Sequence, residues 1–289
     1  MSTDGSAGDA DYGRIGAGYA HYRRPDPRIA APIQAALGGA RTVLNVGAGT
    51  GSYEPADREV TAVEPSATMR AQRADSTAVD ANAEDLPFAD DSFDAAMTTF
   101  SVHQWSDPET GLREMRRVSR GPVLVLTCDP ERLHRFWLTE YVPEVIEVEA
   151  RRYPAIARLR GALGEHTTST VIPVPLDCVD GFNEAYYGRP ESFLDPRALR
   201  ACSAWSFVPD QDRQRGLERL RAELADGTWD RLHGHLRTQP SFAGSLMLVT
   251  AAEKLPPGMS RIGERLRPRG ERGQNGSRPT PRRTSWPST

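Results

Sequence analysis

The chain has 289 residues, 38% of them hydrophobic and 26% charged, which allows one large α/β domain or two smaller ones. Eight arginines and two glutamates give residues 256–289 a charge of +6, so the net charge of −3 leaves −9 on the other 255 residues. An acidic body argues against nucleic acid as the main partner, and no run approaches the roughly 18 apolar residues of a membrane span.

The cysteines and the N-terminal residues indicate a cellular compartment. Residues 1–11 are small, acidic and polar and lack the basic and apolar regions of a secretory signal, so we expect a disordered leader. Cys128, Cys178 and Cys202 are few and far apart, as in proteins that keep reduced thiols. We therefore expect a soluble cytoplasmic protein, with no metal site and no membrane partner.

The first half of the chain alternates short apolar runs with helical patterns. A helical segment around 12–28 is rich in Tyr and Arg, and Asp26-Pro27 then has the form of an N-cap followed by proline at the first helical position. Helices are predicted at 27–37, from 65 toward 73 and at 109–118, and strands at 42–46, 60–63, 78–81, 93–99 and 122–127. This order predicts a parallel sheet with both faces covered.

The second half is less regular. The patterns predict a helix over 133–153 interrupted at Pro143, a strand at 170–176, helices at 216–224 and 229–236, and a last strand at 245–250. In residues 256–289, 15 of the 34 positions are Pro, Gly or Ser, which predicts a disordered tail.

A glycine-rich motif follows the first predicted strand. Gly47-Ala48-Gly49-Thr50-Gly51 lets the backbone turn sharply and approach a ligand, because glycine has no Cβ. Glu64 ends the second predicted strand, 17 residues after Gly47, where the carboxylate of a nucleotide-binding βαβ unit meets ribose hydroxyls. Taken singly, the glycines also fit an ordinary tight turn, and Glu64 also fits a surface side chain.

Residues 83–94 combine acidic and apolar side chains. Leu86, Phe88 and Phe93 can be buried while the polar groups between them stay near the rim, so a loop here would close over an adenine ring. The same pattern, taken alone, also fits an ordinary acidic turn.

Together these motifs resemble the class I S-adenosylmethionine (SAM)-dependent methyltransferases, particularly the branch that modifies small molecules. The resemblance is carried by residues 43–51, Val63-Glu64-Pro65-Ser66 with Met69, residues 83–88, and Phe93-Asp94, and residues 114–126 also fit. It covers about 40–128, near a third of the chain, and the order and spacing of the motifs make it specific.

The resemblance implies a cofactor site. In the family, the glycine loop lies under the methionine part of SAM, the acid that ends the second strand holds the ribose, and the loop before Leu-Pro-Phe holds adenine. The implied SAM-binding residues are Asn45, Gly47, Ala48, Gly49, Thr50, Gly51, Glu64, Pro65, Ser66, Met69, Asn82, Ala83 and Glu84.

Three positions depart from the family pattern. Asn45 stands where the family usually has Asp, and it keeps hydrogen-bonding capacity but lacks the negative charge that helps orient the amino acid end of SAM. Ala48 replaces a commoner Cys or Gly, and Asn82 replaces a frequent acid. Weaker SAM binding is therefore compatible with the sequence.

The segment after the fourth predicted strand is a candidate catalytic region. Ligands of parallel α/β sheets sit outside the carboxyl ends of the strands, which places Phe100 in the cofactor site and His103 near the methyl donor. His103 fits a general base that takes a proton from a hydroxyl or an acidic carbon. It equally fits a structural histidine bonded to a backbone carbonyl.

Aromatic and basic residues precede the core. Tyr12, Tyr19, Tyr22, Arg23 and Arg24 fit a lid helix of the kind seen in the family, in which Arg23 pairs with the SAM carboxylate. They also fit an amphipathic helix with solvated arginines.

The sequence thus predicts an α/β fold: a Rossmann-like, seven-stranded, mostly parallel sheet with helices on both faces and an antiparallel last strand. The expected organisation is a leader at 1–11, a lid helix and SAM-binding core at 12–128, a substrate-cap insertion at 129–215, the end of the core at 216–255 and a basic tail at 256–289.

The expected reaction moves the methyl group of SAM to an oxygen or carbon, with nitrogen left open, on a small-molecule acceptor. No metal is required, because the sulfonium sulfur is already a good leaving group and alignment is the main task. Two alternatives stay open: a SAM-fold protein that only binds SAM or catalyses another reaction, and an NAD(P)-dependent oxidoreductase, against which the GxGxG spacing argues.

Overall fold

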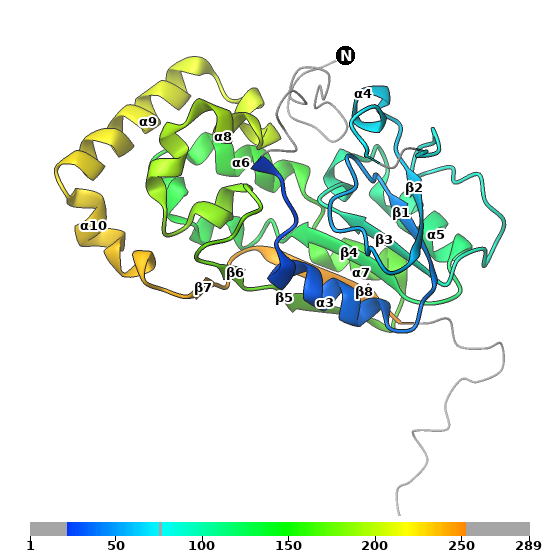
Figure 1. Cartoon of the computed structure of the whole chain (residues 1–289). Coiled ribbons are helices and arrows are strands. Elements are labelled where there is room, and N and C mark those ends of the chain that lie inside the picture. The colour runs from blue at the N-terminus through cyan, green and yellow to red at the C-terminus, as the bar shows by residue number, and fades with distance from the viewer. Residues whose placement is uncertain (1–21, 75–76, 253–289) are drawn as a thin grey trace, which may run out of the picture. The chain divides into compact units, whose positions relative to one another are not determined.

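The computed structural model describes residues 22–74 and 77–252. The expected leader, most of the Tyr- and Arg-rich segment and the basic tail lie outside these residues. A central sheet runs in the order β2-β1-β3-β4-β8-β5 (Figure 1). Its strands are β1 (Thr42–Val46), β2 (Glu59–Val63), β3 (Ala95–Thr99), β4 (Val123–Cys128), β5 (Thr167–Val171) and β8 (Leu246–Ala251).

The strand directions are those expected of a mostly parallel sheet. β1 pairs in parallel with β2 and β3, and β3 pairs in parallel with β4. β8 runs antiparallel to both β4 and β5, so the prediction of an antiparallel last strand is confirmed. A separate two-stranded pair joins β6 (Val174–Pro175) to β7 (Ser241–Phe242).

The described part of the sheet has six strands, and the prediction of seven was wrong. The expected strand at 78–81 is reduced to one bridge, in which Val79 pairs with Val63 at the β2 edge. Only Val79 in this run has strong β propensity, while Asp80 and Asn82 favour turns, so pairing does not extend beyond it.

Helices cover both faces of the sheet and continue beyond its carboxyl edge. The α-helices are α3 (Pro27–Leu37), α4 (Ala67–Arg70), α5 (Pro108–Val118), α6 (Pro143–Arg152), α7 (Ile156–Leu163), α8 (Pro196–Arg200), α9 (Asp210–Ala225) and α10 (Thr228–His233). The 3₁₀ helices are η1 (Val102–Gln104), η2 (Leu133–Arg135), η3 (Trp137–Glu140), η4 (Asn183–Tyr186), η5 (Pro190–Leu194), η6 (Ser203–Phe207) and η7 (Gly234–Arg237).

Prolines set several element boundaries. The predicted helix over 133–153 was wrong in its first half: η2 and η3 occupy it, and Pro143 begins α6 instead of interrupting a helix. Proline suits a first helical position because it has no backbone N–H to satisfy there. Similarly, the predicted strand at 170–176 divides at Pro173, with β5 before it and β6 after it.

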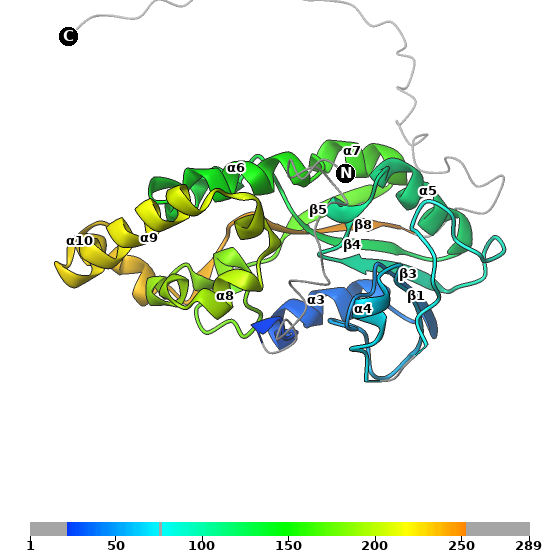
Figure 2. The ribbon, with the colours of Figure 1, turned by 90° about the horizontal axis from the view of Figure 1, so that it is seen from above.

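Two apolar layers hold helices against the sheet, and the side chains of β4 alternate between them. Leu124 and Leu126 pack in one layer with Ile29 and Ile33 of α3. The opposite layer joins Val123 and Val125 to the apolar face of α5 and to α7. Figure 2 shows α3 on one side of the sheet and α5 and α7 on the other.

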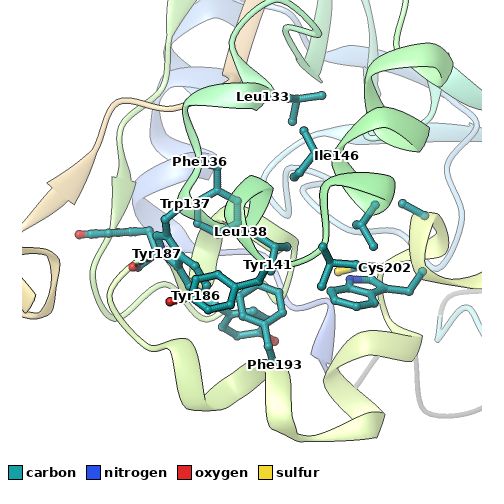
Figure 3. Packing of buried hydrophobic residues seen from close by; sticks show 14 of the residues in the cluster. Leu133, Phe136, Trp137, Leu138, Tyr141, Ile146, Tyr186, Tyr187, Phe193 and Cys202 are labelled. Atoms are coloured by element: carbon teal, nitrogen blue, oxygen red, sulfur yellow. Dashed lines mark hydrogen bonds between the residues drawn. The ribbon is translucent and has the colours of Figure 1, made fainter. Parts of the chain in front are cut away.

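A third apolar core lies among the helices between β4 and β8, a region called the helical lobe below. It is rich in aromatic side chains (Figure 3), including Phe136, Trp137, Tyr187, Phe193 and Trp205. The expected limits of the cap, 129 and 215, stay a prediction, and within them α7 and β5 belong to the sheet and its covering layer. No helix within the described residues is long and apolar enough to span a membrane.

Candidate active site

The glycine motif forms the turn that leaves β1. Gly47, Gly49 and Gly51 have φ values of 66°, 53° and 93°, a region that L side chains rarely adopt. A Cβ at Gly47 would lie 1.8 Å from Oγ of Ser101. Only glycine therefore fits here, and this close approach brings the loop against the segment that holds His103.

Backbone hydrogen bonds fix the other loop residues. The N–H of Ala48 donates to the carbonyl of Val63 at the end of β2, and the N–H of Gly51 donates back to the carbonyl of Ala48, both at 2.9 Å. Ala48 is buried and Thr50 half-buried. The loop is thus closed on itself and held to the neighbouring strand.

Glu64 joins the glycine loop to the start of α4. Its carboxylate is 8% exposed and accepts hydrogen bonds from the backbone N–H of Gly49 and of Ser66, each at 2.8 Å. Ser66 in turn caps α4 by accepting from the N–H of Met69, which is buried beside the loop, whereas Pro65 is exposed. The structure therefore brings Glu64, the residue expected to hold the ribose, together with the loop expected to lie under the methionine part of SAM.

Asn45 lies buried beneath the loop. Its Nδ2 donates to Oε1 of Glu54 at 2.9 Å, while its Oδ1 has no hydrogen-bond partner among residues 22–74 and 77–252. Glu54 pairs with Arg73 at 2.8 Å, and Arg73 also donates to the carbonyl of Gly49 at 3.3 Å. Sequence reasoning missed Glu54 and Arg73, which place a carboxylate next to Asn45, the position where the family usually has one.

The predicted adenine loop lies beside the beginning of α5. Ala83 is buried, Asn82 is exposed, and Glu84 accepts hydrogen bonds from Oγ of Ser106 and the N–H of Asp107, both at 2.9 Å. A Cβ on Gly111 of α5 would lie 3.1 Å from the Cβ of Ala83. The loop is therefore fixed to the helix that follows the His103 segment.

Phe100 and Arg23 meet at the end of β3. Phe100 has a φ of 51°, and the guanidinium of Arg23 lies 4.7 Å from the centre of its ring. Arg23 forms an ion pair with Asp180 at 2.6 Å, and Asp180 also accepts from the hydroxyl of Tyr53 at 2.8 Å. Arg23 thus reaches the site from the N-terminal segment, while Tyr12 and Tyr19 lie outside the described residues.

His103 lies on η1 with 6% of its surface exposed. Burial, together with the positive charges of Arg152 and Arg23, lowers the pKa of its imidazole well below the usual value, so the ring is neutral near pH 7. Its Nδ1 has no hydrogen-bond partner in the part of the chain that the structure describes, and the centre of its ring lies 4.5 Å from that of Tyr153. The backbone carbonyl bond expected of a structural histidine is therefore absent at Nδ1.

The helical lobe adds polar groups that the sequence did not indicate. Glu149 accepts from Nδ2 of Asn183 at 3.0 Å, and burial raises its pKa to about 7. Arg152 and Tyr153 end the same helix, α6. Arg152 and Tyr153 lie about 50 positions after His103 in the sequence and outside any motif, so only the folded chain shows that they approach it.

Comparison with known proteins matches this arrangement. A family model described as a methyltransferase domain matches residues 44–125, which include the glycine loop, Glu64 and His103. A protein described as a methyltransferase from an antibiotic biosynthesis pathway of Anabaena variabilis superimposes with a TM-score of 0.74 and 28% identity, over 80% of this chain and 99% of that one. Residues 44–125 form a class I methyltransferase domain. The cofactor of such domains is S-adenosylmethionine.

Two curated relatives are similar to parts of this chain. Demethylmenaquinone methyltransferase of Porphyromonas gingivalis is 27% identical over 174 residues, which are 50% of this chain and 69% of that one. A 2-methyl-6-phytyl-1,4-hydroquinone methyltransferase of Oryza sativa is 34% identical over 70 residues, 24% of this chain. The match spans only 20% of the rice enzyme.

Proposed function

We propose that this protein transfers the methyl group of SAM to an oxygen or carbon atom of a small-molecule acceptor in the cytoplasm. The observation that carries the proposal is the junction of the glycine loop with Glu64. Three glycines at positive φ and a carboxylate at the end of the adjacent strand lie at the carboxyl edge of the sheet, which is where parallel α/β folds bind nucleotides.

The residues present fit the cofactor. The missing Cβ of Gly47 lets Ser101 lie against the glycine loop. Oδ1 of buried Asn45, which has no hydrogen-bond partner among the described residues, can accept from the ammonium of the amino acid end. Glu64 retains acceptor capacity for ribose hydroxyls, because each carboxylate oxygen has more than one lone pair. Bound SAM supplies a methyl group on a positively charged sulfur.

His103 is the proposed proton acceptor. Ser101, two residues before it, lies against Gly47 of the loop, and the imidazole of His103 is neutral. A neutral imidazole can take a proton from an acceptor hydroxyl or activated carbon as that atom attacks. Burial excludes water that would compete as a proton donor or as a nucleophile.

Hydroxylated rings are the proposed acceptor class. The curated relatives are methyltransferases of demethylmenaquinone and of a phytyl hydroquinone, and the helical lobe above His103 has an aromatic core. The acidic body and the small-molecule acceptors named for the curated relatives make a metabolite a better acceptor than nucleic acid.

Calorimetric titration with SAM and S-adenosylhomocysteine tests the cofactor site. Micromolar binding is expected, and Glu64→Ala should weaken it roughly 10- to 100-fold, because a charged hydrogen-bond acceptor contributes about 1.5–3 kcal/mol. Glu59→Ala, an exposed change on the same strand, serves as the control. Failure of both ligands to bind would overturn the proposal, and binding of NADH instead would favour an oxidoreductase.

A further inference from the structure

Arg152 is a buried cation without an ion-pair partner in the described part of the chain. Its residue surface is 4% exposed, and its Nη1 donates to Oγ of Ser203 at 2.9 Å. The guanidinium also packs over the ring of Phe207 at 4.7 Å. Within the described residues, its Nε and Nη2 have no hydrogen-bond partner. These two donors share one edge of the guanidinium plane.

Such an arrangement is costly unless a ligand completes it. A buried charge without a counterion loses its hydration, and each unsatisfied buried donor adds a further desolvation cost. The carboxyl end of α6 and the ring of Phe207 offset part of this cost. They do not supply acceptors to Nε and Nη2, and the edge carrying these atoms has the geometry that binds oxyanions.

The carboxylate that precedes Arg152 by one helical turn offsets its charge only in part. Glu149 hydrogen-bonds to Asn183, and its pKa of about 7 leaves it only partly ionised at neutral pH. The other nearby cation, Arg23, pairs with Asp180 at 2.6 Å. Arg152 is therefore the cation of this region whose charge is least balanced by the described residues.

Contacts connect Arg152 to the candidate active site. Tyr153, the next residue, packs against the ring of His103, and the charge of Arg152 contributes to the lowered pKa of that imidazole. α6, which ends at Arg152, lies on the same side of the molecule as α5 and α7 (Figure 2). An anion at the free edge of Arg152 would thus lie within electrostatic range of His103.

We propose that Arg152 binds an oxyanion of the methyl acceptor, an ionised ring hydroxyl or a carboxylate, through Nε and Nη2. The inference rests on the proposed function and extends it from the cofactor to the acceptor. Ser203 is a positioning residue, because its hydroxyl holds the opposite side of the guanidinium.

Charge balance explains why a cation and a neutral histidine lie together. For a ring hydroxyl, the O–H bond breaks, its electron pair stays on the oxygen, and the proton moves to His103. Protonating His103 beside Arg152 and Arg23 is unfavourable by itself. The new oxyanion offsets that repulsion and is in turn stabilised by Arg152, so the two charges form together.

Two coloured or absorbing acids, 4-nitrophenol and 4-nitrobenzoate, test the proposal with protein saturated in S-adenosylhomocysteine. Only the ionised form of 4-nitrophenol absorbs visible light, so its spectrum reports its charge when bound. Either of two results is expected. In the first, the pKa of bound 4-nitrophenol is lowered by about one unit, which corresponds to a tenfold preference for the anion. In the second, 4-nitrobenzoate binds and the pKa of 4-nitrophenol does not shift. The first result identifies a ring hydroxylate and the second a carboxylate.

Variants then assign the effect to the guanidinium. Arg152→Gln should abolish the spectral shift or weaken 4-nitrobenzoate binding about tenfold, while Arg152→Lys keeps part of either effect. Arg151→Gln, an exposed change on the same helix, should leave both unchanged. If Arg152→Gln does not fold, the two titrations of the wild-type protein still decide whether an oxyanion is preferred.

Three results would overturn the inference. Wild-type protein that binds S-adenosylhomocysteine but neither ionises 4-nitrophenol nor binds 4-nitrobenzoate has no oxyanion site. An effect that survives in Arg152→Gln has another cause. The third result concerns 5′-methylthioadenosine, which lacks the amino acid end of S-adenosylhomocysteine. If Arg152→Gln no longer prefers S-adenosylhomocysteine over this compound, Arg152 binds the cofactor and not the acceptor. Absence of S-adenosylhomocysteine binding to wild type would instead contradict the proposed function.

Discussion

At the scale of single residues, the geometry of the site depends on the missing Cβ of one glycine. Gly47 has no Cβ, and this allows Ser101 to lie against the loop and carries the His103 segment to the carboxyl edge of the sheet. The sequence predicted the glycines and His103 separately. It could not predict the close approach of Ser101 to Gly47, because nothing in the run from 100 to 105 fixes the turn that follows β3.

Replacement of His103 tests its assigned role. His103→Ala should lower turnover of a phenol or hydroquinone substrate about 100-fold or more, because a positioned base contributes that much to proton transfer. The affinity for S-adenosylhomocysteine should stay within about twofold, since no cofactor contact is lost in this assignment. Exposed His134→Ala is the control in the same assay. Unchanged turnover in His103→Ala would reject the base.

At the scale of elements, caps and prolines decided the boundaries. The Asp26-Pro27 signal predicted the start of α3, and the structure confirms it: Asp26 is buried and accepts from the N–H of Arg28. The same carboxylate accepts from the guanidinium of Arg28 at 2.8 Å and from the N–H of Val179 at 3.1 Å. The cap therefore also holds α3 to the chain that follows β6, a role that the local sequence does not show.

Loss of this cap should destabilise the fold more than loss of its exposed neighbour. Asp26→Ala is expected to lower the free energy of unfolding by about 3 kcal/mol, because it removes a helix cap and leaves the N–H of Val179 unpaired. Asp177→Ala, which removes the exposed partner of Arg28, should change it little. Urea unfolding measures both. Equal effects of the two changes would show that Asp26 acts only as a surface charge.

At the scale of the whole described fold, a buried carboxyl joins the helical lobe to the sheet. Glu184 of η4 is 2% exposed and accepts from the N–H and hydroxyl of Ser245, the residue before β8. Burial raises its pKa to about 7. At low pH the folded and unfolded chains both carry it protonated. As the pH rises from about 4.5 to 7, the unfolded chain loses the proton more readily, so stability falls.

The variant Glu184→Gln isolates this effect because its side chain resembles the protonated acid. Its free energy of unfolding relative to wild type should rise by up to about 3 kcal/mol between pH 4.5 and pH 8, since one pKa unit corresponds to 1.36 kcal/mol. Urea unfolding at several pH values measures the difference. The exposed Glu218→Gln should show a difference that does not vary with pH. A pH-independent difference for Glu184→Gln would contradict a raised pKa.

Local patterns in the sequence determined the sheet, the cofactor loop and the class of chemistry. The glycine loop, Glu64 and the apolar strands are each encoded within a few neighbouring residues, since backbone conformation and hydrophobic periodicity act at short range. Tertiary structure alone decided the partners of Asn45, the reduction of the Val79 strand to one bridge and the approach of α6 to His103. These depend on contacts between residues far apart in the chain, and no local spacing specifies which side chains burial will place together.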